Sequence, residues 1–452
     1  GPGGYVAALR AAQLGAKVCL IEKDVVGGTC LNRGCIPSKA LIHSAALWKR
    51  AKEGGAFGVT ASQWQFDWGK AQSRKNEIVS VQVKGVHTLL QAAKVDVKSG
   101  VGNLVDARTV KVSANGNAET VTGKAIILAS GSEPAKIPGV PVDGEWVLTS
   151  TEALQLPTLP RTFLIVGGGV IGMEFASMLS SLGSQITVVE MLPQILAMED
   201  PMLVRVLQGA LQKQGVSIHV NAKVEKVAGA GSAVRVEISG GTALEAERIL
   251  IATGRSLNSQ HIGLETVGIK TERGAIQVNE RMETSVSGIY AIGDVTGISL
   301  LAHVASMQGL VAAANATGHH ATMDYSAIPN CIYTDPEIAS VGLSEPKAKE
   351  QGRAVKVGRF NFAALGKAMC IGETIGMVKV VADAQSDKVL GVGIVGPHAT
   401  DLIAEAVLAV RHGLTAHQVA EAIHAHPTLP EAVGEAMHDV HGQAIHKARL
   451  RA

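Results

Sequence analysis

Two cysteines, Cys30 and Cys35, stand five residues apart in the sequence GGTCLNRGCIPSK, residues 27–39. On a regular helix this spacing turns the two side chains about 140° apart. A disulfide needs Cα atoms roughly 4.4–6.8 Å apart, so the pair closes only across a distorted turn, and Gly34 and Pro37 are typical of one. Five cysteines in 452 residues are too few for a secreted disulfide scaffold. The pair therefore indicates a redox-active site in a reducing compartment.

The cysteine pair has two other interpretations. Both thiols can be buried and inert, or the pair can be half of a zinc site. The sequence contains no second Cys or His pair with ligand spacing. We therefore expect no metal.

A histidine and a carboxylate lie close together near the C-terminus, in the segment HAHPTLPE with His426 and Glu431. The thiolate is the reactive form of cysteine, and a free thiol has a pKa of roughly 8.5, so thiol chemistry at neutral pH needs a base. A histidine made more basic by a carboxylate can supply it. A His–Glu pair of this kind is also common in a capped loop, and the local pattern does not decide between the two.

The elements that would position these groups begin with a strand–turn–helix–strand pattern over residues 163–190. An apolar strand is followed by Gly167-x-Gly169-x-x-Gly172, a helix, and a second strand that ends at Glu190. This is the dinucleotide-binding pattern, in which the glycines let the backbone approach a pyrophosphate. An acid at this place accepts hydrogen bonds from a ribose and repels a 2′-phosphate, and residues 191–198 contain no Arg. The pattern therefore favours NAD over NADP.

The same pattern opens the chain. After a shift of 168 residues, Gly1 aligns with Gly169, Gly4 with Gly172, and Glu22 with Glu190. The counterparts of Gly167 and of strand 163–166 would precede Gly1. A βαβ unit cannot bury its helix without its first strand, so we expect that strand to be missing from this sequence. Two dinucleotide-binding domains in one chain predict two dinucleotides, most simply a flavin and a nicotinamide.

Further apolar strands precede Gly131, Gly254 and Asp294. Asp294, after a buried strand, is well placed to bind a ribityl chain. It can also be a helix N-cap, and the two roles are compatible. From about residue 343, strands are followed by helices, which predicts a separate α+β domain. The sequence thus predicts an α/β fold with two Rossmann-like domains and a C-terminal α+β domain. The predicted segments are 1–145, 146–275, 276–342 and 343–452.

Composition excludes several partners. Lys and Arg total 41 against 39 Asp and Glu, a net charge of +2. This balance gives no electrostatic reason to expect nucleic acid as a partner. No apolar run reaches the length of about 18 residues that a membrane span needs, so we expect no membrane partner.

These motifs, in this order, resemble those of the flavin-dependent disulfide oxidoreductases, and the resemblance covers essentially the whole chain. The ending IPSK after Cys35 and the segment HAHPT are most similar to the members that oxidise dihydrolipoamide in 2-oxo acid dehydrogenase complexes. The resemblance implies FAD and NAD as cofactors, and a homodimer formed through the C-terminal domain. It also implies the lipoyl domain and E2 core of such a complex as partners. A cytoplasmic location is implied for a bacterial protein and the mitochondrial matrix for a eukaryotic one.

The resemblance also implies roles for single residues. Cys35 would be the thiolate next to the flavin, Cys30 the thiol that meets the substrate, His426 the acid–base residue and Glu431 its partner. Lys39 and Glu174 would pair beside the flavin N5. The implied FAD-binding residues are Gly1, Gly3, Gly4, Glu22, Lys39, Gly131, Asp294, Ala302 and His303, and the nucleotide-binding residues of the second domain are Gly167, Gly169, Gly172, Glu174, Glu190 and Gly254.

Three questions stay open at this stage. Arg33 lies inside the redox motif, where it either lowers the pKa of a neighbouring thiol by its charge or points to solvent. The chain can belong to another disulfide or metal reductase of the same family. It can also be a flavin-free binding subunit, an alternative that rests on the missing first strand.

Overall fold

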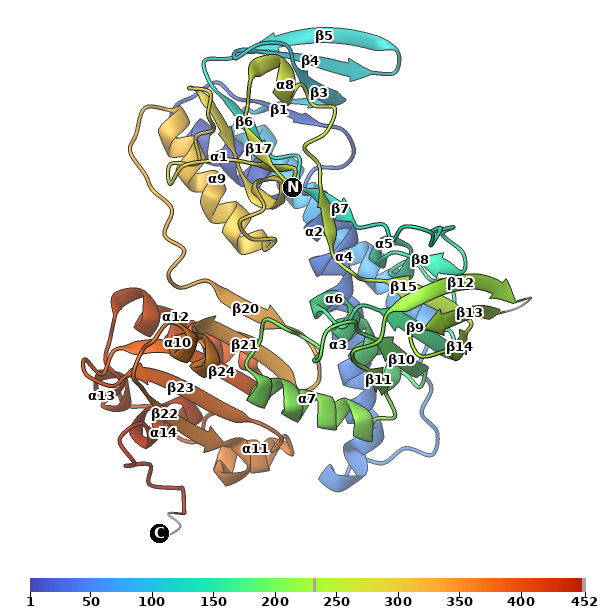
Figure 1. The fold of residues 1–452 in the computed structure, drawn as a ribbon, viewed down its shortest axis with the longest axis vertical. Coiled ribbons are helices and arrows are strands. Elements are labelled where there is room, and N and C mark those ends of the chain that lie inside the picture. The colour runs from blue at the N-terminus through green and yellow to red at the C-terminus, as the bar shows by residue number, and fades with distance from the viewer. Residues whose placement is uncertain (231–232, 449–452) are drawn as a thin grey trace.

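The computed structural model describes residues 1–230 and 233–448, which form three lobes (Figure 1). One lobe contains the N-terminus and both α1 and α9, a second contains the strands β8 to β15, and the third contains the C-terminal part of the chain. Helix α3 (Cys35–Glu53) extends along the junction of the three lobes. None of the helices in the described residues combines the length and the hydrophobicity that crossing a membrane requires.

In the first lobe, two short parallel ladders flank α1. Strand β1 pairs with β2, and β6 pairs with β19. Helix α1 packs closely on α9, and the absence of a side chain at Gly309 allows this contact. A Cβ there would lie 2.6 Å from the carbonyl oxygen of Gly3. The elements are α1 (Pro2–Gln13), β1 (Cys19–Glu22), α4 (Trp68–Ala92), β2 (Asp96–Ser99), β6 (Ile126–Leu128), β19 (Ile289–Ala291) and α9 (Ala302–Ala316), with an antiparallel sheet of β3 (Val101–Leu104), β4 (Thr109–Ala114) and β5 (Asn117–Thr122).

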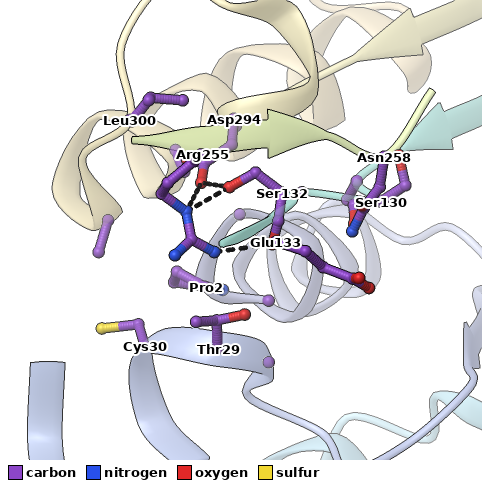
Figure 2. Close-up of a pocket in the computed structure, with 18 of the residues that line it drawn as sticks. Pro2, Thr29, Cys30, Ser130, Ser132, Glu133, Arg255, Asn258, Asp294 and Leu300 are labelled. Carbon is purple, nitrogen blue, oxygen red and sulfur yellow. Dashed lines mark hydrogen bonds and ion pairs between the residues drawn. The ribbon is translucent and has the colours of Figure 1, made fainter. Parts of the chain in front are cut away.

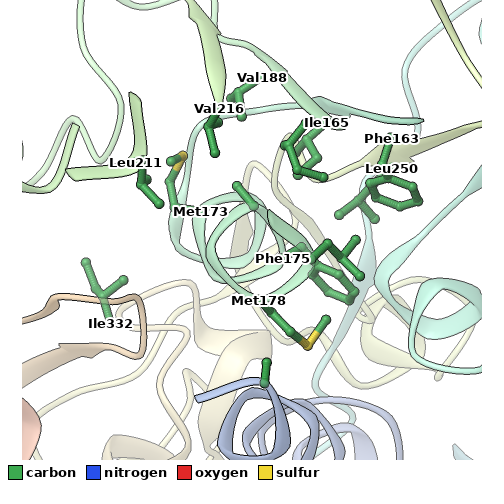
Figure 3. Close-up of a cluster of buried hydrophobic side chains, with 14 of the residues drawn as sticks. Phe163, Ile165, Met173, Phe175, Met178, Val188, Leu211, Val216, Leu250 and Ile332 are labelled. Atoms are coloured by element: carbon green, nitrogen blue, oxygen red, sulfur yellow. The ribbon is translucent and has the colours of Figure 1, made fainter. Parts of the chain in front are cut away.

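The second lobe has the predicted dinucleotide-binding architecture. Its parallel sheet has the order β11-β10-β9-β15-β8, and α6 follows β9 directly. Figure 3 shows α6 within this apolar core: Met173 and Phe175 of α6 and Ile165 of the preceding strand are each less than 5% exposed. The elements are β8 (Val147–Leu148), α5 (Ser150–Ala153), β9 (Thr162–Val166), α6 (Val170–Ser181), β10 (Gln185–Val189), α7 (Pro201–Lys213), β11 (Ser217–His219), β12 (Val224–Ala230), β13 (Ala233–Ile238), β14 (Thr242–Ala246) and β15 (Arg248–Ile251).

The first and second lobes differ in the first strand of the internal repeat. In the second lobe β9 lies between β10 and β15 and pairs with both. In the first lobe β1 and β6 are the counterparts of β10 and β15, and no strand of the described residues pairs with both of them. The ladder β1-β2 is therefore separate from the ladder β6-β19.

The third lobe is an antiparallel sheet of order β20-β21-β24-β23-β22 with helices packed on it. A buried ion pair ties it to α7, with Lys379 Nζ 2.7 Å from Asp200 Oδ2. Its elements are β20 (Pro329–Ile332), β21 (Glu337–Gly342), α10 (Glu345–Glu350), β22 (Val355–Asn361), α11 (Gly366–Ile371), β23 (Met377–Asp383), β24 (Val389–Gly396), α12 (Ala399–His412), α13 (Ala416–Ala420) and α14 (Glu431–Asp439).

Strand pairing suggests boundaries that differ from those predicted. Strands β20 and β21 belong to the C-terminal sheet, so we propose that this domain begins near Pro329 and not at residue 343. Two antiparallel strands, β7 (Ser132–Pro134) and β16 (Arg255–Leu257), connect the first two lobes. Residues after β16 pack on the first lobe, where Leu104 N donates to Ile262 O at 2.9 Å. We therefore propose that the second domain ends near Gly254 and not at residue 275.

Candidate active site

The two cysteines lie on either side of a break between two helices. Cys30 is in α2 (Gly28–Arg33), and Cys35 is the first residue of α3 (Cys35–Glu53). Gly34 separates them with φ −142° and ψ −112°, outside the helical region. A Cβ on Gly34 would lie 2.9 Å from the carbonyl oxygen of Thr29, so the turn leaves no room for a side chain. The distorted turn that the five-residue spacing requires is therefore present.

The turn makes the two thiols unequal. Both are free thiols, and the Cys30 thiol hydrogen-bonds to Cys35. This hydrogen bond, with the charge of Lys39, lowers the pKa of Cys35 to about 7 although burial acts in the opposite direction. The same hydrogen bond raises the pKa of Cys30. The position of Cys35 at a helix N-terminus also favours an anion there. The geometry thus makes Cys35 the thiolate of the pair.

Replacing Gly34 by Ala tests whether the turn between the two cysteines requires a residue without a side chain. The added methyl group would contact the backbone of Thr29 and Cys30, which cannot move aside as a side chain can. We expect Gly34→Ala to lower the free energy of unfolding by about 1–3 kcal/mol, measured by urea denaturation. Gly55→Ala is the matched control, because a Cβ there meets nothing within 4 Å and its stability should be unchanged. Equal stability of the two variants would contradict the close contact.

A lysine–glutamate pair lies beside the cysteines. Lys39, one helical turn after Cys35, places its Nζ 2.9 and 2.8 Å from the two carboxylate oxygens of Glu174 on α6. Glu174 also accepts a hydrogen bond from the backbone N–H of Tyr333 at 3.1 Å. The Lys39 ammonium lies 4.5 Å from the centroid of the Tyr333 ring. This junction therefore joins α3, α6 and the segment after β20.

Arg33 does not act on the thiols. Its guanidinium forms an ion pair with Asp24, and both side chains are exposed. The main charged groups that influence the Cys35 thiol are Lys39 and Glu174, and Arg33 is not among them. Of the two alternatives for Arg33, the solvent-facing one agrees with the structure.

A cavity of about 3640 Å³ extends between the first two lobes. A drug-sized ligand typically occupies roughly 300–1,000 Å³, so this cavity has room for more than one extended ligand. Most of the residues predicted from the sequence to bind a cofactor line it, together with the two cysteines predicted to be catalytic: Gly1, Gly3, Gly4, Glu22, Cys30, Cys35, Lys39, Gly131, Gly167, Gly169, Glu174, Glu190, Gly254, Asp294, Ala302 and His303. Gly172 does not line it. A Cβ there would lie 2.1 Å from the carbonyl oxygen of Gly167, which is the close packing expected of the third glycine.

A polar cluster occupies the part of the cavity next to β7 and β16 (Figure 2). Ser132 donates to Asp294, and Arg255 donates from Nε to Ser132 Oγ at 2.6 Å and from a second nitrogen to Ser132 O at 2.7 Å. The side chain of Asp294 does not cap a helix, because Ile292 is the N-cap residue of its short helix (Gly293–Thr296). The N-cap interpretation of Asp294 is therefore wrong, and its binding of a ribityl chain stays a prediction.

The cavity fits FAD in its chemistry. Ser130 Oγ is buried without a hydrogen-bond partner, as expected where a polar ligand completes the site. Gly1 and Gly3 stand at the N-terminus of α1, where free backbone N–H groups favour a pyrophosphate. A Cβ on Gly1 would meet nothing within 4 Å, so space remains in front of this terminus. These residues, with Glu22 and Asp294, would hold the FAD.

The second lobe fits a nicotinamide dinucleotide. The space in front of Gly169, the N-cap residue of α6, is open, since a Cβ there meets nothing within 4 Å. Glu190 follows β10, and its carboxylate accepts hydrogen bonds from the N–H groups of Gly168 at 2.6 Å and Leu192 at 2.8 Å. This holds the acid beside the glycine turn, where a ribose hydroxyl is bound in such folds.

His426 and Glu431 form a hydrogen-bonded pair at 3.0 Å between Nδ1 and Oε2. Glu431 also accepts from the Thr428 N–H at 2.7 Å, so the pair lies within a capped loop. Burial acts to raise the pKa of Glu431, but these two contacts outweigh it and hold the pKa below its usual value. The His426 side chain is 79% exposed, and neither residue lines the cavity that contains the cysteines. Within one chain, His426 and the cysteine pair are therefore apart.

The loop that carries His426 is fixed by another histidine. His424 Nε2 lies 2.9 Å from Glu405 on α12, and this contact raises the pKa of His424.

Across the described residues, no three His, Cys, Asp or Glu side chains are grouped so as to hold a metal ion.

A family model for the pyridine nucleotide-disulphide oxidoreductases matches residues 1–309. The chain belongs to this family. A second model, for the dimerisation domain of the pyridine nucleotide-disulphide oxidoreductases, matches residues 328–437.

Similar proteins agree with the family. A dihydrolipoyl dehydrogenase of Bacillus subtilis is 44% identical over 99% of this chain and 97% of its own length. One of Geobacillus stearothermophilus is 41% identical over 99% and 96%. Among solved structures, LpdA from Mycobacterium tuberculosis is 30% identical with a TM-score of 0.92 over 97% of each chain. The HOCl-induced flavoprotein disulfide reductase RclA from Escherichia coli is 28% identical with a TM-score of 0.88, again over 97% of each chain.

Membership in the oxidoreductase family confirms the predicted resemblance, the α/β fold class and the enzyme class, with FAD and NAD as the cofactors. Three residues that contact the predicted site residues were not predicted from the sequence: Ser132, Arg255 and Tyr333. Arg255 directly follows Gly254, three residues after the end of β15, a position that could have drawn attention to it. Tyr333 had no such signal.

Proposed function

We propose that this oxidoreductase oxidises protein-bound dihydrolipoamide to lipoamide with NAD⁺ as the electron acceptor. The observation that carries this proposal is the unequal cysteine pair, with Cys35 favoured as the thiolate and Cys30 as the exchanging thiol. The dihydrolipoyl dehydrogenase relatives, similar over nearly their whole length, support the choice of substrate. The acid Glu190 beside the glycine turn supports NAD over NADP.

In the proposed reaction, His426 takes a proton from one thiol of dihydrolipoamide, and Glu431 stabilises the charge on the imidazole. The substrate thiolate attacks Cys30 in the Cys30–Cys35 disulfide, forming a mixed disulfide and releasing Cys35 as a thiolate. The second substrate thiol attacks the substrate sulfur of the mixed disulfide, and its proton passes to the departing Cys30 sulfur. Lipoamide leaves as the cyclic disulfide, and Cys30 leaves as a thiol. The enzyme has then gained the two electrons that the substrate lost.

Bound FAD would pass this electron pair from the cysteines to NAD⁺ as a hydride, which restores the disulfide. The N-terminus of α3 and the charge of Lys39 stabilise Cys35 as a thiolate until this transfer occurs. Glu174 fixes the position of the Lys39 ammonium by its two contacts. The two half reactions share the same cysteines, so we expect ping-pong kinetics.

His426 lies away from the cysteines of its own chain, and the chain carries the dimerisation domain of its family. We therefore propose a homodimer in which His426 of each chain serves the cysteine pair of the other. The proposed partner is the lipoyl domain of a 2-oxo acid dehydrogenase complex, together with its E2 core. We propose a bacterial cytoplasm as the location, since the relatives described above are bacterial.

A pair of steady-state assays tests the proposed activity. We expect rapid reduction of NAD⁺ by dihydrolipoamide, and little oxidation of NADPH by glutathione disulfide. The opposite result would assign the chain to a different disulfide reductase of the family. A purified protein without flavin absorbance would support the flavin-free subunit and overturn the proposal.

The pH dependence of the reduced enzyme gives a further test. A thiolate next to an oxidised flavin produces a long-wavelength absorbance band, and the pKa of Cys35 is lowered to about 7. The thiolate exists above this pKa, so the band should be strong at alkaline pH and should fade as the pH falls through about 7. Spectra of the two-electron-reduced enzyme across this range measure the midpoint. A band that fades only as the pH rises would contradict the thiolate assignment.

A further inference from the structure

Tyr333 is the point at which the C-terminal domain meets the redox site. It follows β20 directly, and its side chain lines the cavity together with Lys39 and Glu174. The segment around it is held by polar contacts to two helices. Tyr333 N donates to Glu174 at 3.1 Å, and Asp335 N donates to Ser177 Oγ at 2.9 Å, both on α6. Asp335 also pairs with Lys49 of α3 at 2.7 Å. The backbone that carries the Tyr333 ring is therefore anchored to α3 and α6.

The ring of Tyr333 and the carboxylate of Glu174 both contact the Lys39 ammonium. The Nζ atom lies 4.5 Å from the ring centroid, within the distance of about 6 Å at which a cation is attracted to an aromatic face. A lysine side chain is flexible and strongly hydrated, so one contact alone leaves the ammonium free to move toward water. The Lys39 side chain is 31% exposed and lines the cavity, so there is space on the cavity side into which the ammonium can move.

We propose that Tyr333 is a positioning residue for the redox centre: its ring holds the Lys39 ammonium at the place from which its charge stabilises Cys35 as a thiolate. This role rests on the proposed function, because the group that it stabilises is the Cys35 thiolate of the proposed reaction. It adds to that of Glu174, whose two carboxylate oxygens contact the same ammonium from α6.

The physical link is the spacing of the two residues on α3. Lys39 is four residues after Cys35, so the two side chains lie on the same face of the helix. The charge of Lys39 lowers the pKa of Cys35. If the ring is removed, the ammonium moves outward, its field at the sulfur weakens, and the pKa of Cys35 rises.

The Tyr333 hydroxyl is not needed for this effect. Burial raises the pKa of Tyr333 to about 12, so the phenol stays neutral at physiological pH and contributes no charge. The titratable groups around the Lys39 ammonium come from α2, α3, α6 and the segment 331–333: Cys30, Cys35, Glu174, Cys331 and Tyr333.

Two variants separate the ring from the rest of the residue. Tyr333→Phe keeps the ring, Tyr333→Leu removes it, and both keep the backbone N–H that holds Glu174. We expect the long-wavelength band of the reduced, FAD-loaded Leu variant to titrate with a midpoint about half a pH unit above that of the unmodified enzyme. The Phe variant should titrate like the unmodified enzyme. FAD content and the melting temperature are measured in parallel.

A double-variant cycle distinguishes positioning from a general loss of packing. In a Lys39→Met background, Tyr333→Leu should cause no further shift of the midpoint, because the ring then has no ammonium to hold. An unshifted midpoint in Tyr333→Leu, an equal shift in Tyr333→Phe, or a shift that persists in the Lys39→Met background would each overturn the role. Tyr333→Met replaces the Leu variant, under the same criteria, if the latter does not retain FAD. A missing band in the unmodified enzyme would instead refute the proposed function itself.

Discussion

We expect Cys35→Ser to lower the turnover of dihydrolipoamide with NAD⁺ by more than about a thousandfold and to abolish the long-wavelength band of the reduced enzyme. Cys35 is the first residue of α3, and its pKa is lowered by the hydrogen bond from Cys30 and by the charge of Lys39. A serine hydroxyl at this place cannot form the disulfide and does not ionise at neutral pH. Both the reaction path and the optical signal are therefore lost. Steady-state kinetics and absorbance spectra measure the two effects.

Cys30→Ser is the matched variant for this prediction. It also prevents disulfide formation, so turnover should fall by a similar factor. Because Cys35 remains, the thiolate band should persist, and it should be present even without a reductant. Cys370→Ser, an exposed thiol outside the cavity, should leave both readouts unchanged. A band in Cys35→Ser with none in Cys30→Ser would reverse the assignment of the two cysteines.

The second large effect is expected from His426→Gln, which should lower turnover by about 10²- to 10⁴-fold while FAD content stays normal. Glutamine can still accept or donate a hydrogen bond to Glu431, but it cannot take a proton from the substrate thiol. Since His426 is 79% exposed and lies outside the cavity, the substitution should not disturb the flavin site. Turnover across a range of pH and the ratio of flavin to protein measure these two outcomes.

A control and a mixing experiment sharpen the test of His426. His446→Gln alters another exposed histidine that pairs with a glutamate, Glu435, and should leave turnover unchanged. If His426 serves the other subunit, a heterodimer of one His426→Gln chain and one Cys35→Ser chain has one site that contains both functional groups. Such mixed dimers should regain measurable turnover, whereas each parent variant has almost none. Normal turnover in His426→Gln would rule out its role as the base.

Much of the fold was predictable because its signals are local. The glycine turn at Gly167, the helix after it and the acid at Glu190 are set by backbone sterics and by short apolar runs, which neighbouring residues determine. The break between Cys30 and Cys35 was predictable for the same reason, since helix geometry alone excludes closure of a regular five-residue spacing. Domain boundaries were less accessible. Strand β21 joins the C-terminal sheet through β24, about 50 to 60 residues later in the sequence, and β20 joins it through β21.

The sequence by itself determined the chemistry that the chain can carry: a thiol pair, two glycine turns that favour dinucleotides, and a histidine with its carboxylate. Only the tertiary structure decided how these groups act on one another. It placed Lys39 between Glu174 and Tyr333, separated His426 from the cysteines of its own chain, and paired Arg33 with Asp24. The physical reason is that charge and hydrogen bonding act through space. The strength of each contact depends on the distance between the two groups in space. The number of residues between them along the chain does not predict that distance.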